Sequence, residues 1–488
     1  MTDDQSYDDT MALGRQLGAA YQDVTGHPIH VELITHLIWR WLREGYSVDA
    51  LLEECVRRAR EDAGAPVEVP VPVPPGPTPA PTPAPHPSAL QGPLRLAQDG
   101  ACVEDDTGPV LPVLCHFGDG LALYARDPAW AEAELDAMTA AGYHGVRTWT
   151  VLRGAYWERL GRTLTPEDAG YWEAGAGFAA ALTRRGLRWL VSQGDLMAHS
   201  GGATDRRRFM GWLAETLRRA GGLDLVVGVD GGNESWQNGE DDPARLREAV
   251  DAFRDVLPVP IWSLTSPPGE ERAELDAYAG SVYDVHGARG GHVWDKIRHA
   301  FSIPYEGRPA CRLGIQSEPP GPGPMVSVTE HQEELDAEAM ALLTAQHLLC
   351  RQISVYFSSP GVSVRARGEF LQQPGFREAP AIARALPPDL MRFATLCHGG
   401  ARWRGTRVLA VPEGSELRCD HAIAADGRFV CAVYGPPGRY TVEIERACDL
   451  RVLHPAWAQL IDAGRRAVGD RLVVEITKGR LIIGRIIT

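Results

Sequence analysis

Residues 226–238 read VVGVDGGNESWQN, a short valine-rich run followed by Gly-Gly and then by Asn233, Glu234 and Trp236. A β-branched apolar run of this length is typical of a strand buried on both faces, as in a parallel sheet. Polar residues directly after such a strand lie at its C-terminal end, where α/β enzymes hold their active sites. The stretch therefore predicts an α/β fold with its chemistry at Asn233 and Glu234.

A second stretch ends in another glutamate. Residues 311–321 read CRLGIQSEPPG, in which an apolar run leads into Glu318 and then into two prolines. Glu234 and Glu318 are 84 residues apart, which is 28 residues per step if three β/α units separate them. A βαβ repeat takes about 30 residues or slightly more. The spacing therefore places the two glutamates after strands four and seven of a barrel.

Strand candidates alternate with amphipathic segments such as WAEAELDAMTAAG, DRRRFMGWLAETLRRAG, DPARLREAVDAFRDV and EELDAEAMALLTAQHLLC. Strict alternation is typical of an α/β fold with a parallel sheet. Eight repeats in roughly 250 residues favour a (β/α)₈ TIM barrel over an open, doubly wound sheet. The glycine-rich segments lack the strand–helix context of a dinucleotide site. The eight expected strands are Val110–His116, Gly145–Thr150, Arg188–Gln193, Leu223–Asp230, Pro260–Ser266, Ser281–His286, Ala310–Gln316 and Gln352–Phe357.

Residues 1–64 are expected to form a small helical domain. Ile34, Leu37, Ile38 and Trp41 follow the i, i+3, i+4 spacing of an amphipathic helix. One interpretation is a self-contained three-helix bundle. The other is a docking or oligomerisation module that tethers the rest of the chain to a larger assembly.

A proline-rich linker is expected at residues 65–92. Prolines at alternate positions fix φ and remove backbone donors, which predicts a stiff polyproline-II spacer. Residues 93–400 are expected to form the catalytic barrel, with a leading β-hairpin at 94–112 and a helix near Ala379–Leu396. Residues 401–488 combine period-2 alternation with frequent turn signals, which predicts a small antiparallel β-sandwich. Without a catalytic cluster, this last domain is interpreted as an accessory.

Composition narrows the class of partner and the compartment. The net charge of −15 over 488 residues, with no basic face, argues against a nucleic-acid partner. The nine scattered cysteines include no C-x-x-C pair, which favours free thiols. The first ten residues, MTDDQSYDDT, lack the features of a signal peptide. No apolar run approaches the ~18 residues of a membrane span. We therefore expect a cytoplasmic location, with a virion or release by lysis as the alternative.

Two carboxylates that face each other across a barrel mouth are suited to cleaving a glycosidic bond. If they lie about 5–5.5 Å apart, one attacks the anomeric carbon while the other protonates the leaving oxygen. Asn233, beside Glu234, is expected to hydrogen-bond a sugar hydroxyl. Arg147, in the VRTWT segment, is expected to hold Glu318 ionised through a charge-assisted hydrogen bond.

The order of these residues resembles a known clan. Arg147 on strand two, Asn233-Glu234 on strand four, His286 on strand six and Glu318 on strand seven resemble the retaining glycoside hydrolases with (β/α)₈ barrels. Cellulases, mannanases and β-glycosidases belong to that clan, and a C-terminal β-sandwich is a common companion. The resemblance implies that Glu234 is the acid/base, that Glu318 is the nucleophile and that the other three residues bind substrate.

The resemblance covers roughly residues 94–488 and leaves the helical domain and the linker unexplained. Many members of the clan carry a tyrosine two residues after the strand-six histidine, where this chain has Ala288. Many also carry a tryptophan at the end of strand eight, where this chain has Tyr356-Phe357-Ser358. These departures leave a rival hypothesis open, a non-catalytic carbohydrate-binding or structural head on a degenerate barrel. The intact glutamate pair favours the enzyme.

Aromatic residues in the expected mouth loops complete the candidate site. Trp149, Trp236 and Trp294 are expected to stack on sugar rings, with core packing as the alternative for each. His286 is either part of the site or a core histidine. His286 and His292 lack the i, i+4 spacing and the third ligand of a zinc site, so neither a metal nor a cofactor is expected.

The sequence thus predicts a retaining glycoside hydrolase that cleaves a β-linked oligo- or polysaccharide by double displacement. Its expected partners are the carbohydrate substrate and, through residues 1–64, a protein scaffold or virion such as a phage particle. No nucleic-acid or membrane partner is expected.

Overall fold

The structure is a computed structural model of the chain, and all described residues lie in the compact unit Pro85–Thr488. The predicted helical domain at residues 1–64 lies outside the described residues, as does the predicted linker as far as residue 89. The structure describes residues 90–98, 100–192, 203–220, 223–230, 244, 251, 262–263, 265–266, 282–286, 292–293, 313–323, 334–394, 409–411, 416–444, 448–454, 459–466 and 471–486.

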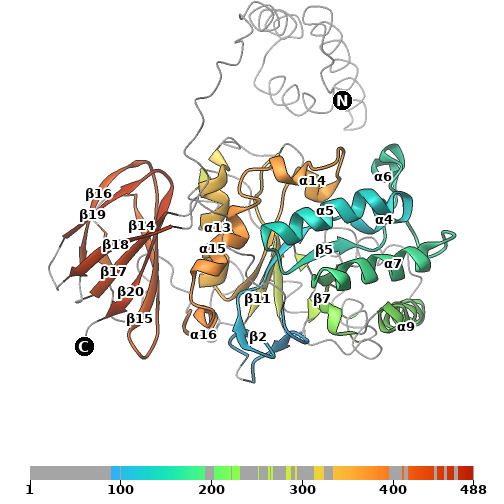
Figure 1. Cartoon of the computed structure of the whole chain (residues 1–488), viewed down its shortest axis with the longest axis horizontal. Helices are drawn as coiled ribbons and strands as arrows, with labels where there is room; N and C mark the ends of the chain where they lie inside the picture. The colour runs from blue at the N-terminus through green and yellow to red at the C-terminus, as the bar shows by residue number, and fades with distance from the viewer. Residues whose placement is uncertain are drawn as a thin grey trace, which may run out of the picture. The chain divides into compact units, whose positions relative to one another are not determined.

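A parallel sheet forms the centre of the larger domain (Figure 1). Its strand order is β8-β7-β6-β5-β4-β12-β11-β10-β9. The two end strands, β8 and β9, are separated in sequence by residue 264 alone, so β8 pairs with β7 on one side and β9 pairs with β10 on the other. The sheet therefore closes on itself as a (β/α)₈ barrel, as predicted. The strands are β4 (Val113–His116), β5 (Gly145–Trp149), β6 (Arg188–Ser192), β7 (Val226–Asp230), β8 (Trp262–Ser263), β9 (Thr265–Ser266), β10 (Tyr283–His286), β11 (Gly314–Glu318) and β12 (Gln352–Tyr356).

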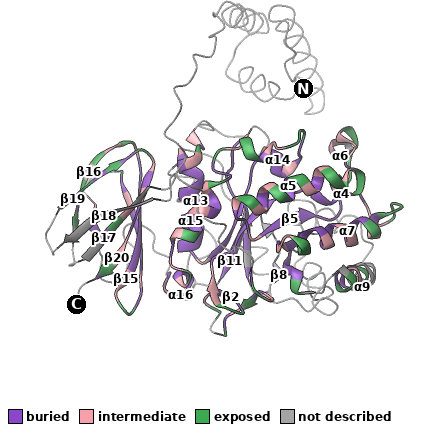
Figure 2. Cartoon of the chain, viewed as in Figure 1, coloured by how far each residue is buried: buried purple, intermediate pink, exposed green. Residues whose placement is uncertain are grey.

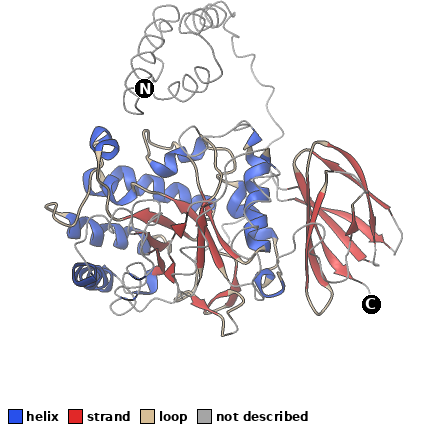
Figure 3. Ribbon diagram, turned by 180° about the vertical axis from the view of Figure 1, so that it is seen from behind, coloured by secondary structure: helices blue, strands red, loops and turns tan. Residues whose placement is uncertain are grey.

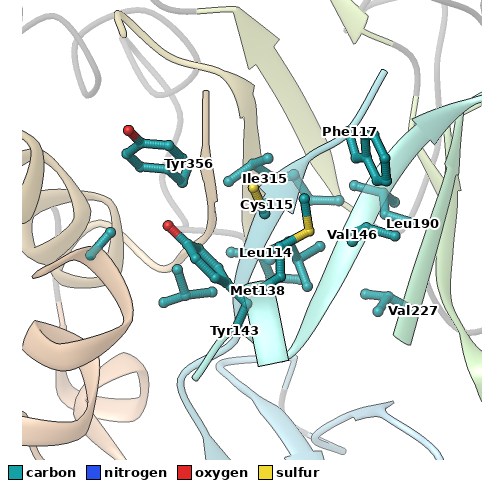
Figure 4. Packing of buried hydrophobic residues seen from close by; sticks show 14 of the residues in the cluster. Leu114, Cys115, Phe117, Met138, Tyr143, Val146, Leu190, Val227, Ile315 and Tyr356 are labelled. Atoms are coloured by element: carbon teal, nitrogen blue, oxygen red, sulfur yellow. The ribbon is translucent and has the colours of Figure 1, made fainter. Parts of the chain in front are cut away.

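Both faces of the barrel strands are buried, which explains their high content of apolar residues. Every residue of β4, β5, β7, β11 and β12 is buried. Figure 4 shows how apolar side chains from several strands pack into one cluster. Burial of such side chains contributes about 25 cal/mol per Å² of apolar surface, and it dominates the stability of the fold.

Helices lie on both sides of the strands in Figure 3. Local signals set the limits of α5, because Asp127 caps its first turn through the Trp130 N–H, Pro128 occupies its first position, and Gly142 ends it in a left-handed conformation. None of the described helices is long and apolar enough to span a bilayer. The helices are α4 (Gly120–Arg126), α5 (Pro128–Ala141), α6 (Ala155–Leu160), α7 (Tyr171–Arg184), α9 (Ala203–Ala220), α13 (Ala337–Leu349), α14 (Ser359–Val362), α15 (Glu378–Ala385) and α16 (Leu390–Phe393), with 3₁₀ turns η1 (Leu223–Leu225) and η3 (Phe370–Gln372).

Two of the predicted elements are each divided at a proline, which corrects their predicted bounds. The helix expected near Ala379–Leu396 is divided into α15 and α16. Pro387 and Pro388 have no backbone N–H to donate a helical hydrogen bond, and their rings clash with the preceding turn, so α15 ends before them. The strand expected at Val110–His116 is likewise divided around Pro112. Val110 belongs to the leading hairpin, and the barrel strand starts only at Val113.

The predicted leading hairpin is present, with its turn at residues 105–108. Strands β1 (Arg95–Leu96), β2 (Val103–Asp105) and β3 (Gly108–Val110) form a small antiparallel sheet. Arg188, the first residue of β6, donates hydrogen bonds to the carbonyls of Leu90 and Gly92. The segment that leads into the hairpin therefore lies at the N-terminal end of the barrel strands.

Two antiparallel sheets make up the C-terminal part, as predicted. In β19 buried and exposed residues alternate strictly, and Figure 2 shows both buried and exposed segments on the strands of this part. Leu409, Val474, Val433 and Ile482, from strands of both sheets, share one hydrophobic core. The two sheets therefore pack as a sandwich. One sheet contains β13 (Leu409–Ala410), β16 (Gly438–Ile444) and β19 (Arg471–Ile476), and the other contains β14 (Arg418–Ile423), β15 (Arg428–Tyr434), β20 (Gly479–Ile486), β17 (Cys448–His454) and β18 (Gln459–Arg466).

The barrel helix α13 contacts this sandwich through a buried carboxylate. Glu338 accepts hydrogen bonds from the Arg480 guanidinium at 2.6 Å, from the Thr477 hydroxyl and from the Gly479 N–H. Burial opposes its charge, but these donors outweigh burial and hold the pKa of Glu338 below its ordinary value. The sandwich is thus attached to the barrel by a charged pair with several further donors.

His347 in α13 provides a test of core burial. Its Nδ1 lies 2.9 Å from the Ser354 hydroxyl, and burial lowers the pKa of His347 to about 3. In the unfolded chain the His347 imidazole binds a proton below about pH 6.5, whereas in the folded chain it stays neutral until about pH 3. The free energy of unfolding is therefore unaffected by this group above pH 6.5, and it decreases as the pH falls from 6.5 toward 3. In urea unfolding at pH 6.5 and 4.5, wild type is expected to lose about 2–3 kcal/mol more than His347→Gln, at about 1.4 kcal/mol per pH unit.

The matched control is Ser354→Ala, which removes the hydrogen bond and keeps the imidazole. Its pH dependence is expected to follow that of wild type. Equal losses in wild type and His347→Gln would show that this histidine titrates alike in the folded and unfolded chain.

Candidate active site

Three of the predicted site residues meet in the barrel, where Arg147 lies in the middle of β5 and His286 and Glu318 end β10 and β11. The Arg147 Nη1 atom on β5 donates to the Glu318 Oε1 atom on β11 at 2.7 Å. The His286 Nδ1 atom, at the end of β10, lies 3.6 Å from the Glu318 Oε2 atom. The Arg147 side chain has no exposed surface, and that of Glu318 is 8% exposed. The predicted contact between Arg147 and Glu318 is therefore present in a nearly dry site.

Arg147 also contacts groups that the sequence analysis did not single out. Its Nη2 atom donates to the Asp230 Oδ2 atom at 3.0 Å, and its Nη1 atom lies 3.3 Å from the His116 Nδ1 atom. The Ser192 hydroxyl donates to the same Asp230 oxygen at 2.6 Å. Asp230 ends β7 and Ser192 ends β6, and the two residues are partners in the register of those strands. A second carboxylate thus lies beside the guanidinium.

A third carboxyl group, that of Asp284 on β10, completes this buried cluster. Burial and the charge of Asp230 raise the pKa of Asp284 to about 7, against the opposing effects of Arg147 and His286. Burial disfavours the charge on Arg147, but Glu318, Asp230 and Asp284 outweigh it and raise the pKa of Arg147 above its ordinary value. The surroundings therefore disfavour the charge on Asp284 and favour the charge on Arg147.

Aromatic rings line the barrel beside the cluster. The Trp149 and His116 rings pack edge to face with centroids 4.7 Å apart, and the His116 ring lies at the same distance from Phe357. A Cβ atom at Gly118 would lie 2.7 Å from the Trp149 ring, so only glycine fits there. Phe357 directly follows β12, at the position where the sequence analysis noted a missing tryptophan. The three rings of His116, Trp149 and Phe357 therefore pack together as a buried aromatic cluster.

The other predicted site residues have mixed outcomes. Asn233, Glu234, Trp236 and Trp294 lie outside the described residues. Trp149 is the last residue of β5 rather than part of a loop, and only 8% of its surface is exposed. The Trp149 ring packs against His116 and Trp157, so Trp149 is part of the hydrophobic core and also lies at the C-terminal end of β5.

Four residues of the cluster were missed by the sequence analysis. A signal was available for all of them, because each is a polar residue at or near the end of a strand that is otherwise apolar. In a strand buried on both faces such a residue needs a partner inside the protein. The four residues are His116, Ser192, Asp230 and Asp284.

Possible metal ligands were considered over the same part of the chain. Among the described residues, no group of three or more His, Cys, Asp or Glu side chains is arranged to hold a metal ion. The described cysteines with free thiols are all buried. They are Cys102, Cys115, Cys350, Cys419 and Cys431.

Comparison with known proteins identifies the fold. No protein-family model matches the sequence, and no curated protein matches it significantly. A solved structure described as a glycoside hydrolase matches with a TM-score of 0.58 at 10% identity, over 81% of this chain and 97% of that chain. A glycoside hydrolase family 5 protein from Bacteroides vulgatus ATCC 8482 matches with a TM-score of 0.55 at 11% identity, over 81% and 94%. The fold is that of the (β/α)₈ glycoside hydrolases.

At these identities the similarity concerns the fold, and the resemblance predicted from the sequence is confirmed at that level. Both matches cover most of the other chain and about four-fifths of this one. The chemistry must be argued from the site residues themselves.

Gly321 holds the loop after β11 close to the loop after β12. A Cβ atom at Gly321 would lie 1.9 Å from the Phe357 carbonyl oxygen, which is a backbone atom and not the movable end of a side chain. The Gly321→Ala variant is expected to be less stable by about 2–4 kcal/mol, because one loop must shift. Thermal unfolding measures this effect.

A matched control is Gly175→Ala in α7. A Cβ atom at Gly175 would meet nothing closer than the Thr216 Cγ2 atom at 3.7 Å, which is an ordinary contact. This variant is expected to gain about 0.5–1 kcal/mol, since alanine suits a helix better than glycine. Unfolding of Gly321→Ala at the wild-type temperature would contradict the close approach of the two loops.

Proposed function

We propose that this protein is a retaining glycoside hydrolase that acts on a β-linked oligo- or polysaccharide. The observation that carries the proposal is the buried Glu318 at the C-terminal mouth of the barrel, held by Arg147 and facing His286. A guanidinium beside a carboxylate stabilises its ionised form, which a nucleophile requires. The glycoside hydrolase fold supports the same chemistry.

In the proposed first step, a Glu318 carboxylate oxygen attacks the anomeric carbon. The bond from that carbon to the glycosidic oxygen breaks, and Glu234 gives its proton to the leaving oxygen. In the second step Glu234 takes a proton from water, and the resulting hydroxide displaces Glu318 from the anomeric carbon. The sugar leaves with its original configuration, and both carboxyl groups return to their starting states.

The remaining predicted residues are proposed to hold the substrate. Asn233 is proposed to hydrogen-bond a sugar hydroxyl. The rings of Trp149, Trp236 and Trp294 are proposed to stack on sugar rings. Residues 1–64 and the proline-rich linker are proposed to attach the barrel to a protein scaffold such as a virus particle. Release by lysis is then the proposed route by which the enzyme reaches its polysaccharide.

The test is hydrolysis of a panel of aryl β-glycosides and polysaccharides, with the anomeric configuration of the first product followed by proton NMR. A β-configured first product supports retention, whereas an α-configured one contradicts double displacement. Glu234→Gln is expected to lose turnover on polysaccharide and to keep more of it on aryl glycosides with acidic leaving groups, which need no proton.

The alternative is a non-catalytic carbohydrate-binding or structural head. The substitution of Phe357 for the strand-eight tryptophan of many clan members favours it. Saturable sugar binding by the wild-type protein, without turnover on any member of the panel, would establish that alternative.

A further inference from the structure

The Arg147 guanidinium divides its two terminal nitrogens between two buried carboxylates. Nη1 donates to Glu318 Oε1 at 2.7 Å, and Nη2 donates to Asp230 Oδ2 at 3.0 Å. Arginine otherwise tends to bind one carboxylate with two parallel hydrogen bonds, and that bidentate pairing is the stronger one. The arrangement in this barrel therefore departs from the pairing that Arg147 and Glu318 would favour by themselves.

We propose that Asp230 is a positioning residue that, together with Ser192, keeps Arg147 on a single oxygen of Glu318. This role deepens the proposed function, on which its kinetic consequence rests. A bidentate Arg147 would engage both carboxylate oxygens of Glu318 and make the carboxylate a weaker nucleophile. Because Asp230 accepts the hydrogen bond from Arg147 Nη2, that nitrogen does not donate to Glu318 Oε2.

Ser192 makes Asp230 a fixed acceptor rather than a mobile one. Its hydroxyl donates to the same Oδ2 atom at 2.6 Å, and its oxygen lies 3.4 Å from Arg147 Nη2. The side chains of Arg147 and Asp230 have no exposed surface, so water does not compete for these hydrogen bonds. Ser192 and Asp230 are register partners on adjacent strands, which places them at one height in the barrel.

The other groups that face this arrangement come from two further strands, β4 and β10. His116 Nδ1 on β4 lies 3.3 Å from Arg147 Nη1, and His286 Nδ1 on β10 lies 3.6 Å from Glu318 Oε2. Asp284 accepts the backbone N–H of Ser317 at 3.3 Å. The His286 imidazole thus lies beside the second oxygen of Glu318, the one that Arg147 Nη1 does not contact.

The experiment compares Asp230→Asn with Asp230→Ala. Both variants remove the same negative charge, but only asparagine keeps an oxygen that accepts from Arg147 Nη2 and from Ser192. A difference in kcat or in the Glu318 titration midpoint between the two variants is therefore due to the hydrogen-bond acceptor and not to the charge. Asp230→Leu, which fills the volume of the aspartate, replaces the alanine variant if that variant does not fold. Thermal unfolding establishes which variants are folded.

Two readouts are taken on each folded variant. The first is kcat and KM on an aryl β-glycoside that the wild type cleaves. The second is the titration of the Glu318 carboxyl carbon by ¹³C NMR in protein labelled at glutamate, with the resonance assigned by its absence from Glu318→Gln. The second readout needs no turnover.

We expect Asp230→Asn to keep kcat within a few-fold of wild type, and Asp230→Ala to lose about 10- to 100-fold in kcat with a smaller change in KM. The Glu318 midpoint is expected to lie about one pH unit lower in Asp230→Ala than in Asp230→Asn, because a second hydrogen bond from Arg147 stabilises the carboxylate. Equal kcat and equal midpoints in the two variants would overturn the proposal. If wild type cleaves no substrate, the proposed function fails, and the two midpoints alone decide the role of Asp230.

Discussion

Replacing Glu318 with glutamine is expected to lower kcat on an aryl β-glycoside by about 10⁴-fold or more while the protein stays folded. Glutamine keeps the size of the side chain and an oxygen that accepts from Arg147 Nη1. What it lacks is the ionised oxygen that forms the bond to the anomeric carbon. The loss is therefore expected in kcat, with a thermal unfolding temperature close to that of wild type.

Rescue of activity by an external anion distinguishes a nucleophilic role of Glu318 from a purely structural one. In Glu318→Ala the carboxylate is absent, and azide is expected to enter the space and attack the anomeric carbon of an activated aryl β-glycoside. The carbon–nitrogen bond forms, the aryloxide leaves, and the product is the α-glycosyl azide. Product analysis by NMR identifies it.

A matched control is Glu369→Gln, which changes a carboxylate outside the buried cluster. Glu369 accepts the backbone N–H groups of Arg365 and Ala366 at the surface. Its replacement is expected to leave kcat within a few-fold of wild type. Retention of more than a tenth of the activity in Glu318→Gln would remove Glu318 from the role of nucleophile.

Arg147→Met is expected to have the second largest effect. The guanidinium lies among the carboxyl groups of Glu318, Asp230 and Asp284, and these interactions hold its own pKa above the ordinary value. Removing one partner of a buried ion pair costs about 3–5 kcal/mol, because the charge that remains has no compensation. In this cluster the remaining carboxylates also repel one another.

The sign of the pH effect follows from the missing cation. Without Arg147 the pKa of Asp284, which burial already raises, rises further, so the folded variant holds a proton that the unfolded chain has released. Its stability is therefore best at low pH and falls as the pH rises. Urea unfolding at pH 5 and pH 8 is expected to show a larger deficit relative to wild type at pH 8, and kcat at neutral pH is expected to fall by about 100-fold or more.

The control for this variant is Arg184→Met on α7. Arg184 pairs with Glu132 at 3.0 Å, but more than half of its side chain is exposed. An exposed pair of this kind contributes between about 0 and 1 kcal/mol, and it is screened by salt. A deficit in Arg147→Met that is no larger than that of Arg184→Met, or that does not grow with pH, would contradict the importance of the buried cation.

The barrel itself could be predicted from the sequence because its strands are buried on both faces. Such strands must be apolar along their whole length, and the helices between them must be amphipathic, so both patterns appear directly in the residues. The pairing of Arg147 with Glu318, which are 171 residues apart, was predictable for the same reason. Parallel strands present their C-terminal ends at one mouth, and the order of the strands is the order of the chain.

Polar residues at strand ends marked the site, but their partners could not be assigned from spacing. Asp230 accepts from Arg147 and Ser192 only because β6 and β7 shift their register between Trp189 and Leu190. Side chains alternate between the two faces of a strand, so a shift by one residue reverses the face to which each of them points. The sequence alone does not specify that shift.

The amino-acid sequence by itself thus determined the class of fold, the number and order of the barrel strands, the antiparallel C-terminal part and the Arg147–Glu318 contact. Only the tertiary structure decided that Asp230, Ser192, His116 and Asp284 surround the guanidinium. The physical reason is that apolar periodicity is a local property of each segment. The contacts of a buried charge depend instead on the relative register of strands that are far apart in the chain.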